Sequence, residues 1–182
     1  MKTKFIKTRL DYDGSQLKPL FSYIHHQVHG DSIVSFAGAC DVTFEHMVDA
    51  EDLVVMAKIK SDNMLHFIVE LFGQNLMTAV SLQRLLVTIV QQVLLKRGHR
   101  LERSGDDLYF NKKKFSVSIA SVSAVSAMIH LGLNIENQGT PVPTCALSDF
   151  GIEFESFANE TLGAFSSEYL SIVEATQKVR PL

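Results

Sequence analysis

The sequence lacks the features that mark several large classes of protein. Its 182 residues include only two cysteines, Cys40 and Cys145, which are too few for a disulfide framework. No uninterrupted apolar run approaches the ~20 residues that a helix needs to span a bilayer. The N-terminus has charged residues but no apolar stretch of signal-peptide length after them. These absences predict a cytoplasmic protein that does not interact with a membrane.

Strong charge bias and repetition are also missing. The formal net charge is −3, with Lys/Arg and Asp/Glu mixed along the chain, so no polybasic patch indicates nucleic-acid binding. We find no internal repeat and no low-complexity segment. The composition that remains, 46% hydrophobic and 20% charged, is typical of an ordinary globular protein. We expect one domain over residues 1–182.

The hydrophobic pattern predicts strands grouped with a few long helices. Helical spacing of apolar residues predicts helices over 17–28, 76–96 and 153–178. Short β-branched or apolar runs predict strands at 4–10, 32–36, 53–59, 64–72, 107–111, 114–121 and 124–135. The pattern breaks over 37–52 and again over 137–143, which are expected to be loops. This order favours an α+β fold in which helices pack against a mixed β-sheet.

The most informative stretch begins at residue 105. GDDLYFNKKKFS over 105–116 resembles the hairpin of biotin protein ligases that reads Asn-Asp-Leu-Tyr, a turn, then Lys and a small residue. MIHLGLNI over 128–135 is similar to the Gly-x-Asn strand that follows it, and lipoate ligases and octanoyl transferases carry related forms. The resemblance implies the biotin/lipoate protein ligase fold, which is related to the class II aminoacyl-tRNA synthetases. The stretches YDGSQL, EHMVDAED and LSDFGI also resemble an uncharacterised conserved prokaryotic family assigned to this fold.

The resemblance also implies site residues. Lys114 matches the active-site lysine of these families, where a cation offsets negative charge on acyl and phosphoryl oxygens. In octanoyl transferases the lysine supports a cysteine that carries the acyl group as a thioester. Cys145 follows Asn134 at a similar spacing, so the expected catalytic residues are Lys114 and Cys145. The expected substrate-binding residues are Asp107, His130, Gly132 and Asn134. His66 is a further candidate, because strand alternation places it on one face with Glu70, from which either can line the pocket beside Lys114.

Two features depart from the ligases. Val117 stands where their lysine strand continues into a glycine that admits ligand. The stretch 37–52 contains five carboxylates and no Lys or Arg, whereas the ligases bind the adenylate through a loop rich in Gly and Arg. A triphosphate would meet like charges there, so ATP-dependent adenylation by the family's usual means is disfavoured. Two alternatives remain: a divalent cation bridges the carboxylates to a phosphate, or the substrate is itself cationic, such as an amine. Candidate ligands for a divalent cation are Glu45, His46 and Asp49.

Three interpretations follow. The first is an acyltransferase with Cys145 as nucleophile and Lys114 as its electrostatic partner. The second is a ligase or transferase with altered substrate that uses Lys114 and the acidic stretch, with a divalent cation as cofactor. The third is a non-catalytic relative that binds a small molecule or serves in an assembly, since a free cysteine is usually a small core hydrophobe. We expect acyl or carboxylate transfer on a small-molecule or acyl substrate, because the lysine, asparagine and cysteine occur in family order. The sequence leaves a homo-oligomer open.

Overall fold

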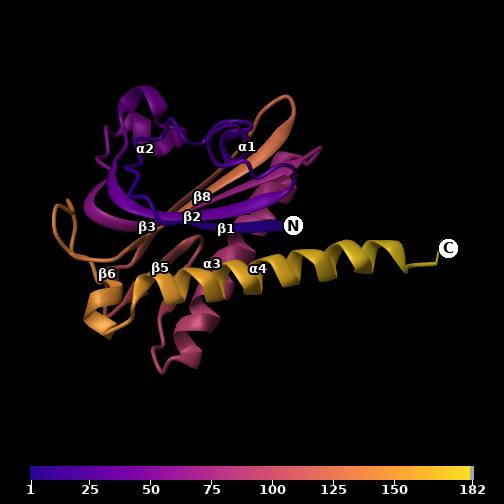
Figure 1. The fold of residues 1–182 in the computed structure, drawn as a ribbon. Coiled ribbons are helices and arrows are strands. Elements are labelled where there is room, and N and C mark those ends of the chain that lie inside the picture. Colours follow the sequence, from indigo (N-terminus) through magenta and orange to yellow (C-terminus); the bar gives the residue numbers. More distant parts are fainter. Residues whose placement is uncertain (181–182) are drawn as a thin grey trace.

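A five-stranded mixed sheet forms the centre of the protein (Figure 1). The computed structural model describes residues 1–180, and the last two residues of the expected domain lie outside the described part. The strand order is β1-β2-β3-β8-β7, with β1 parallel to β2 and every other pair antiparallel. These strands are β1 (Lys2–Ile6), β2 (Ser32–Asp41), β3 (Lys60–Phe72), β7 (Ser116–Val122) and β8 (Ser126–Asn134).

Four α-helices and a second, smaller sheet complete the fold. The three-stranded sheet has the order β4 (Glu102–Ser104), β5 (Asp107–Phe110) and β6 (Lys113–Lys114). The helices are α1 (Phe21–His26), α2 (Ala50–Val54), α3 (Leu76–Lys96) and α4 (Phe154–Gln177). This arrangement confirms the predicted α+β fold with helices packed against a mixed sheet.

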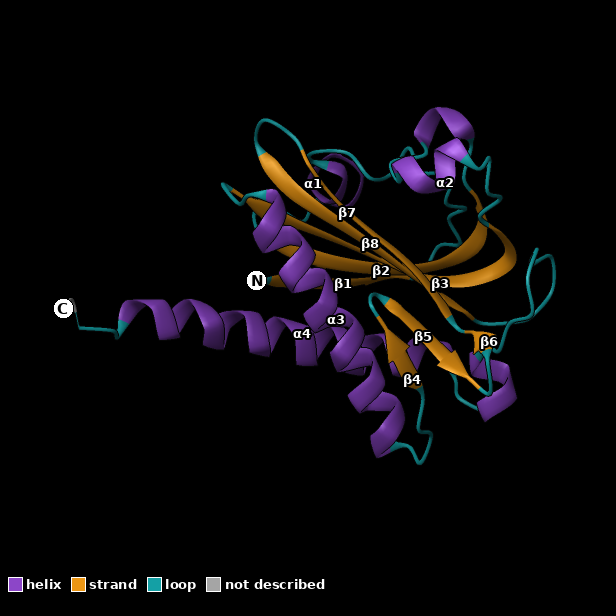
Figure 2. Cartoon of the chain, turned by 180° about the vertical axis from the view of Figure 1, so that it is seen from behind, coloured by secondary structure: helices purple, strands orange, loops and turns teal. Residues whose placement is uncertain are grey.

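The large sheet separates two apolar layers. Along β3, Leu65, Phe67 and Val69 are fully buried in the core shared with α3 and α4. Met64 and Ile68 belong to a second, smaller cluster, because side chains alternate between the faces of a strand. Figure 2 shows α3 and α4 on one side of the sheet and α1 and α2 on the other. The larger cavity of the described residues lies on the second side.

α3 supplies much of the main core. The side chain of Asn75 caps its first turn by accepting the backbone N–H of Thr78 at 2.9 Å. Gly98 follows the helix at φ +89°, as is common after a helix C-terminus. Within residues 1–180, α3 is the one helix long and apolar enough to cross a membrane. It packs against β7, β8 and α4, which are the contacts of a core helix.

The lysine-bearing hairpin is present and leads directly into the large sheet. Tyr109 of β5 lies opposite Lys114 of β6, and Asn111 and Lys112 make the turn at positive φ. Only Phe115 separates β6 from β7. Lys114 is therefore held at the junction of the two sheets.

The helix predicted over 17–28 is largely wrong. Only Phe21–His26 are α-helical, and the residues before them form turns. Leu20 takes a positive φ of 64°, and the buried carboxylate of Glu70 accepts its N–H at 2.7 Å. This contact from β3 fixes the chain in a non-helical conformation that apolar spacing does not reveal.

The boundaries around the predicted acidic loop also need correction. β2 continues to Asp41, so the loop predicted over 37–52 starts later. The strand predicted at 53–59 is wrong, because its first residues belong to α2. Asp49 caps α2 by accepting the N–H groups of Glu51 and Asp52, and this cap outweighs the β-branched character of the residues that follow.

Candidate functional site

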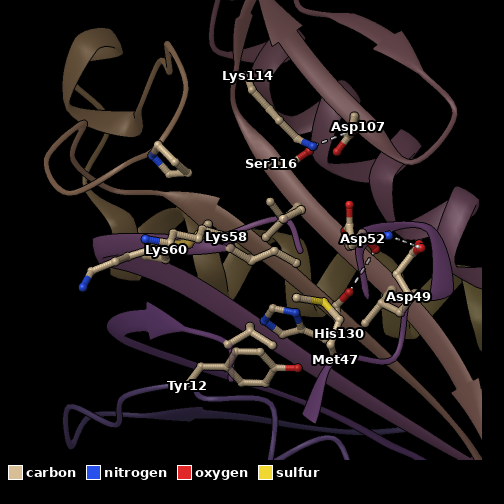
Figure 3. Close-up of a pocket in the computed structure, with 18 of the residues that line it drawn as sticks. Tyr12, Met47, Asp49, Asp52, Lys58, Lys60, Asp107, Lys114, Ser116 and His130 are labelled. Carbon is tan, nitrogen blue, oxygen red and sulfur yellow. Dashed lines mark hydrogen bonds and ion pairs between the residues drawn. The ribbon is translucent and has the colours of Figure 1, made fainter. Parts of the chain in front are cut away.

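A cavity of about 400 Å³ lies on the sheet face that α3 and α4 leave free. Its floor is formed by side chains of β3, β7 and β8, one wall by residues within 42–60, and the other by 140–144. Figure 3 shows Lys58 and Lys60 on one side of it and Asp49 and Asp52 on the other. Apolar side chains line much of the remainder, namely Leu17, Val42, Met47, Ile59, Met64, Val117 and Ile119.

Lys114 lies among carboxylates at this cavity. Its Nζ is 2.9 Å from Oδ2 of Asp107 (Figure 3), which also accepts the hydroxyl of Tyr109 at 3.2 Å. The pKa of Asp52 is raised by burial and by the carboxylates of Asp49 and Asp107, while Lys114 opposes the shift. Lys114 is therefore one cation shared by several acidic groups, and an anionic ligand would have to compete with Asp107 for it.

Asn134 links the backbone segments that carry Lys114 and Cys145. Its Nδ2 donates to the backbone carbonyl oxygens of Lys114 and Cys145, each at 3.2 Å. The N–H of Cys145 donates to the same carbonyl of Lys114 at 3.1 Å, and the N–H of Lys114 donates to Pro143 at 3.0 Å. The structure brings the three residues together through their main chains, so Asn134 positions the segment that carries Lys114.

The side chain of Cys145 points away from this cavity. Cys145 is 1% exposed, belongs to the main core and is absent from the cavity lining. Its Sγ lies 3.5 Å from the carbonyl oxygen of Lys113, and burial raises the pKa of the thiol to about 11. A nucleophilic cysteine needs an accessible thiolate, so this environment weighs against the predicted acyl-thioester role.

The predicted metal ligands do not converge. His46 and Asp49 line the cavity, whereas Glu45 is exposed outside it. Asp49 is engaged as the cap of α2, and Nδ1 of His46 lies 3.1 Å from the hydroxyl of Thr43. Among residues 1–180, no group of three or more His, Cys, Asp or Glu side chains is placed to hold a metal ion. The divalent-cation hypothesis therefore gains no support from these side chains.

Two of the predicted binding residues, His66 and Gly132, are absent from the cavity lining. His130 lines the cavity, whereas His66 lies behind it, with Nδ1 3.0 Å from Nε2 of His130. Gly132 leaves room for its neighbours, since a Cβ there would come within 3.0 Å of Met64 and 3.2 Å of Val117. Val117 thus fills space above Gly132 and forms part of the lining.

Tyr12, Lys58 and Lys60 also line the cavity and were not predicted from the sequence. Tyr12 reaches the floor because the chain from Leu10 crosses close to Gly38, where a Cβ would lie 2.0 Å from the carbonyl oxygen of Leu10. A glycine inside a predicted strand signals such a close approach. No local pattern marks the lysines, which supply the positive charge missing from 37–52.

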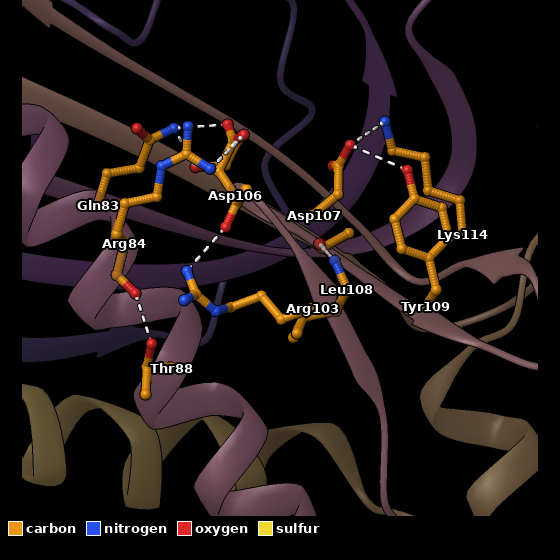
Figure 4. Close-up of polar contacts among 12 residues, drawn as sticks. Gln83, Arg84, Thr88, Arg103, Asp106, Asp107, Leu108, Tyr109 and Lys114 are labelled. Carbon is orange, nitrogen blue, oxygen red and sulfur yellow. Dashed lines mark hydrogen bonds and ion pairs between the residues drawn. The ribbon is translucent and has the colours of Figure 1, made fainter.

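A network behind the small sheet orients the acidic residues next to Lys114. Nε2 of the buried Gln83 donates to Oδ2 of Asp106 at 2.8 Å and to the hydroxyl of Ser118 at 2.9 Å. Arg84 pairs with the other oxygen of Asp106 at 3.0 Å (Figure 4). Asp106 is therefore held by α3, while its neighbour Asp107 faces Lys114.

Solved structures with this fold place the chain among the biotin and lipoate ligases in architecture. The biotin protein ligase of Aquifex aeolicus in complex with biotin aligns with a TM-score of 0.64 at 15% identity, over 96% of this chain and 72% of the ligase. A T. acidophilum protein provisionally assigned as a lipoate protein ligase, with bound lipoic acid, aligns with a TM-score of 0.62 at 13% identity, over 92% and 85%. At such identities these similarities define the fold, which confirms the predicted architecture.

The chain belongs to the family described as "Domain of unknown function (DUF366)", whose model matches residues 1–180. A solved protein of unknown function from Pyrococcus horikoshi has 38% identity and a TM-score of 0.95, with each chain covered completely. The predicted membership in an uncharacterised family with the biotin/lipoate ligase fold is therefore confirmed.

Proposed function

We propose that this protein binds a small carboxylic acid in the cavity and catalyses transfer of its acyl or carboxylate group. The observation that supports this is the position of Lys114, whose ammonium group lies beside a cavity that many apolar side chains line. An acid with an apolar body suits such a site, because the body is removed from water while the cation binds the carboxylate. Biotin and lipoic acid, bound by two proteins of this fold, are acids of this kind.

The proposed reaction does not use Cys145, because its sulfur is buried away from the cavity. Lys114 would bind the carboxylate and stabilise the negative charge that develops on its oxygens during transfer. Lys58 and Lys60 would bind a further anionic group, such as a phosphate that activates the acid. We place this activity in the cytoplasm, where both cysteines can stay reduced.

The direct test is calorimetric titration with biotin, lipoate and octanoate, each compared with its primary amide. Binding of the acids and not of the amides is expected, because the amide carries no charge for Lys114. Lys114→Gln should weaken acid binding by roughly 10- to 100-fold, the range for a hydrogen bond to a charged group. Lys113→Gln is the matched control, since Lys113 is exposed and absent from the lining. Equal binding of acids and amides would contradict the proposal.

A non-catalytic binding protein is the second candidate. The pairing of Lys114 with Asp107 and the burial of the Cys145 thiol favour it, because neither group is free to react. Turnover distinguishes the two functions. Each bound acid would be incubated with ATP, Mg²⁺ and hydroxylamine. Release of pyrophosphate would be measured, together with formation of the acyl hydroxamate that hydroxylamine gives with an activated acyl group. Acid binding without either product would support the non-catalytic function.

A further inference from the structure

Two buried histidines and a tyrosine form a stack at the floor of the cavity. The rings of Tyr12 and His130 are parallel, with centroids 3.7 Å apart and an interplanar angle of 7°. His66 lies beside both, with its centroid 5.2 Å from that of Tyr12. His66 is 0% exposed and His130 is 3% exposed. The ring of His130 is therefore fixed in place while one edge of it reaches the cavity.

The hydrogen bonds of the pair determine where each ring carries its proton. Nε2 of His66 lies 3.4 Å from the carbonyl oxygen of Gly38, and a carbonyl oxygen only accepts. Nε2 of His66 therefore carries the hydrogen, and Nδ1 of the neutral ring is an acceptor. That acceptor lies 3.0 Å from Nε2 of His130, which must then be the donor. Nδ1 of His130 then carries no hydrogen and can only accept a hydrogen bond.

The neutral state of both rings has a clear physical cause. Burial lowers the pKa of His66 to about 4 and lowers the pKa of His130 well below its ordinary value. For His130, the neighbouring His66 opposes a positive charge further. At neutral pH the pair therefore carries no added proton, and the tautomers set by Gly38 apply.

Nδ1 of His130 is an acceptor with nothing to accept from. Among residues 1–180, no side chain or backbone group is hydrogen-bonded to it, although His130 is nearly buried and lines the cavity. Nδ1 of His130 is not among the fully buried polar atoms of the described residues that lack a partner, so it keeps contact with solvent at the cavity. A ligand that covers Nδ1 without offering a donor would leave it buried and unpaired, which is costly. A ligand that supplies a donor would avoid this cost.

We infer that His130 determines specificity by accepting a hydrogen bond, through Nδ1, from an N–H or O–H group of the bound molecule, with His66 as the positioning residue that fixes this tautomer. The inference rests on the proposed function for the acid bound at Lys114 and adds a second requirement. The ligand is then an acid whose apolar body ends in, or carries, a hydrogen-bond donor such as a hydroxyl or a ring amide. A plain saturated acid would leave Nδ1 without a partner and would bind roughly tenfold or more weakly.

The tautomer can be tested without any ligand. Nitrogen NMR of protein labelled with ¹⁵N at histidine distinguishes a protonated ring nitrogen from an unprotonated one. At neutral pH, His130 should show a protonated Nε2 and an unprotonated Nδ1, and His66 the same pattern. In His66→Phe the acceptor for Nε2 of His130 is lost, so the ring should become a mixture of both tautomers. A protonated Nδ1 on His130 in the unsubstituted protein would overturn the inference.

The recognition step is tested with matched acids. Thermal stabilisation would be measured with ω-hydroxy acids of graded chain length and with the ω-methoxy acids of the same length, which have an acceptor but no donor. The hydroxy acids should bind roughly tenfold or more tightly, and His130→Phe should abolish the difference while it leaves Lys114 intact.

The outcomes separate this inference from the proposed function. Equal binding of hydroxy and methoxy acids would overturn the role of His130 and leave the carboxylate site standing. If neither series binds while NMR shows an unprotonated Nδ1, the carboxylate proposal fails and the acceptor assignment survives. If His130→Phe still binds the hydroxy acids more tightly than the methoxy acids, a group other than His130 accepts the hydrogen bond. That result would also overturn the inference.

Discussion

The ammonium nitrogen of Lys114 lies 2.9 Å from Oδ2 of Asp107, and this ion pair stands between the small sheet and the cavity. The two side chains are 32% and 24% exposed, so solvent screens their attraction. Such pairs contribute about 0–1 kcal/mol to stability. We therefore expect Asp107 to affect the charge of the site more than the stability of the fold.

Asp107→Asn should increase affinity for carboxylic acids several-fold. The substitution removes the carboxylate that competes with a ligand for Lys114, and it should change the free energy of unfolding by less than about 1 kcal/mol. Calorimetry with the acid that binds best measures the first effect, and urea denaturation measures the second. Asp106→Asn is the control, because its partners are Gln83 and Arg84. Asp106→Asn should lower the free energy of unfolding without increasing affinity for the acid. Higher affinity in Asp106→Asn and unchanged affinity in Asp107→Asn would contradict this account.

The buried histidines should make the protein less stable in mild acid. The pKa of His66 is lowered from 6.5 to about 4, and that of His130 is lowered as well, chiefly by burial. Below about pH 6.5 the unfolded state binds protons that the folded state does not. The free energy of unfolding therefore decreases as the pH falls from about 6.5 towards 4. The slope should approach about 1.4 kcal/mol per pH unit for each histidine.

Denaturation curves at several pH values check this slope. His66→Phe should flatten it, because one of the two shifted titrations is removed. His29→Gln is the control, since His29 is exposed, and it should leave the slope unchanged. Parallel slopes for the original protein and His66→Phe would show that the pair does not titrate as expected.

Gly38→Ala should disrupt the floor of the cavity. The new Cβ would lie 2.0 Å from the carbonyl oxygen of Leu10, so one backbone segment must move away from the other. We expect a loss of more than about 2 kcal/mol in stability and the loss of ligand binding, because Tyr12 follows directly after this crossing. Gly163→Ala is the control. It lies in α4 with open space around it, and it should increase stability by up to about 1 kcal/mol.

Both thiols should be unreactive in the folded protein. Burial raises the pKa of Cys145 to about 11 and that of Cys40 to about 12, and the thiolate is the reactive form. A chromogenic disulfide reagent at neutral pH should react slowly with the native protein and rapidly after unfolding. Rapid native labelling that maps to Cys145 would revive its predicted role as a nucleophile.

The spacing of apolar residues was sufficient to predict a helix where the local sequence and the tertiary contacts favour the same structure. α3 and α4 lie within about a residue or two of their predicted ranges, because their apolar faces pack on the sheet as the spacing requires. The segment 17–28 shows the opposite case. Its apolar residues follow helical spacing, but the carboxylate of Glu70 holds the N–H of Leu20. That contact joins residues far apart in the sequence, so no local window contains it.

Some residues of the candidate site could likewise be predicted from the sequence, and others could not. Family resemblance predicted Asp107, Lys114, His130 and Asn134 as site residues, and all four line the cavity. Resemblance could not show which way the side chain of Cys145 points, because the backbone of that segment lies beside Lys114 while the sulfur enters the core. Tyr12 was missed for another reason. It begins the stretch YDGSQL, which indicates family membership, but it reaches the site by a chain crossing that this stretch does not reveal.

The alternation along β3 has a consequence for how this family can diversify. Leu65, Phe67 and Val69 face the core that holds the fold together, whereas Met64 and His66 face or support the cavity. Changes at one set of positions alter foldability, and changes at the other alter what is recognised. A lineage can therefore acquire a new ligand by substitutions at every second residue of one strand, while the intervening residues keep the scaffold intact.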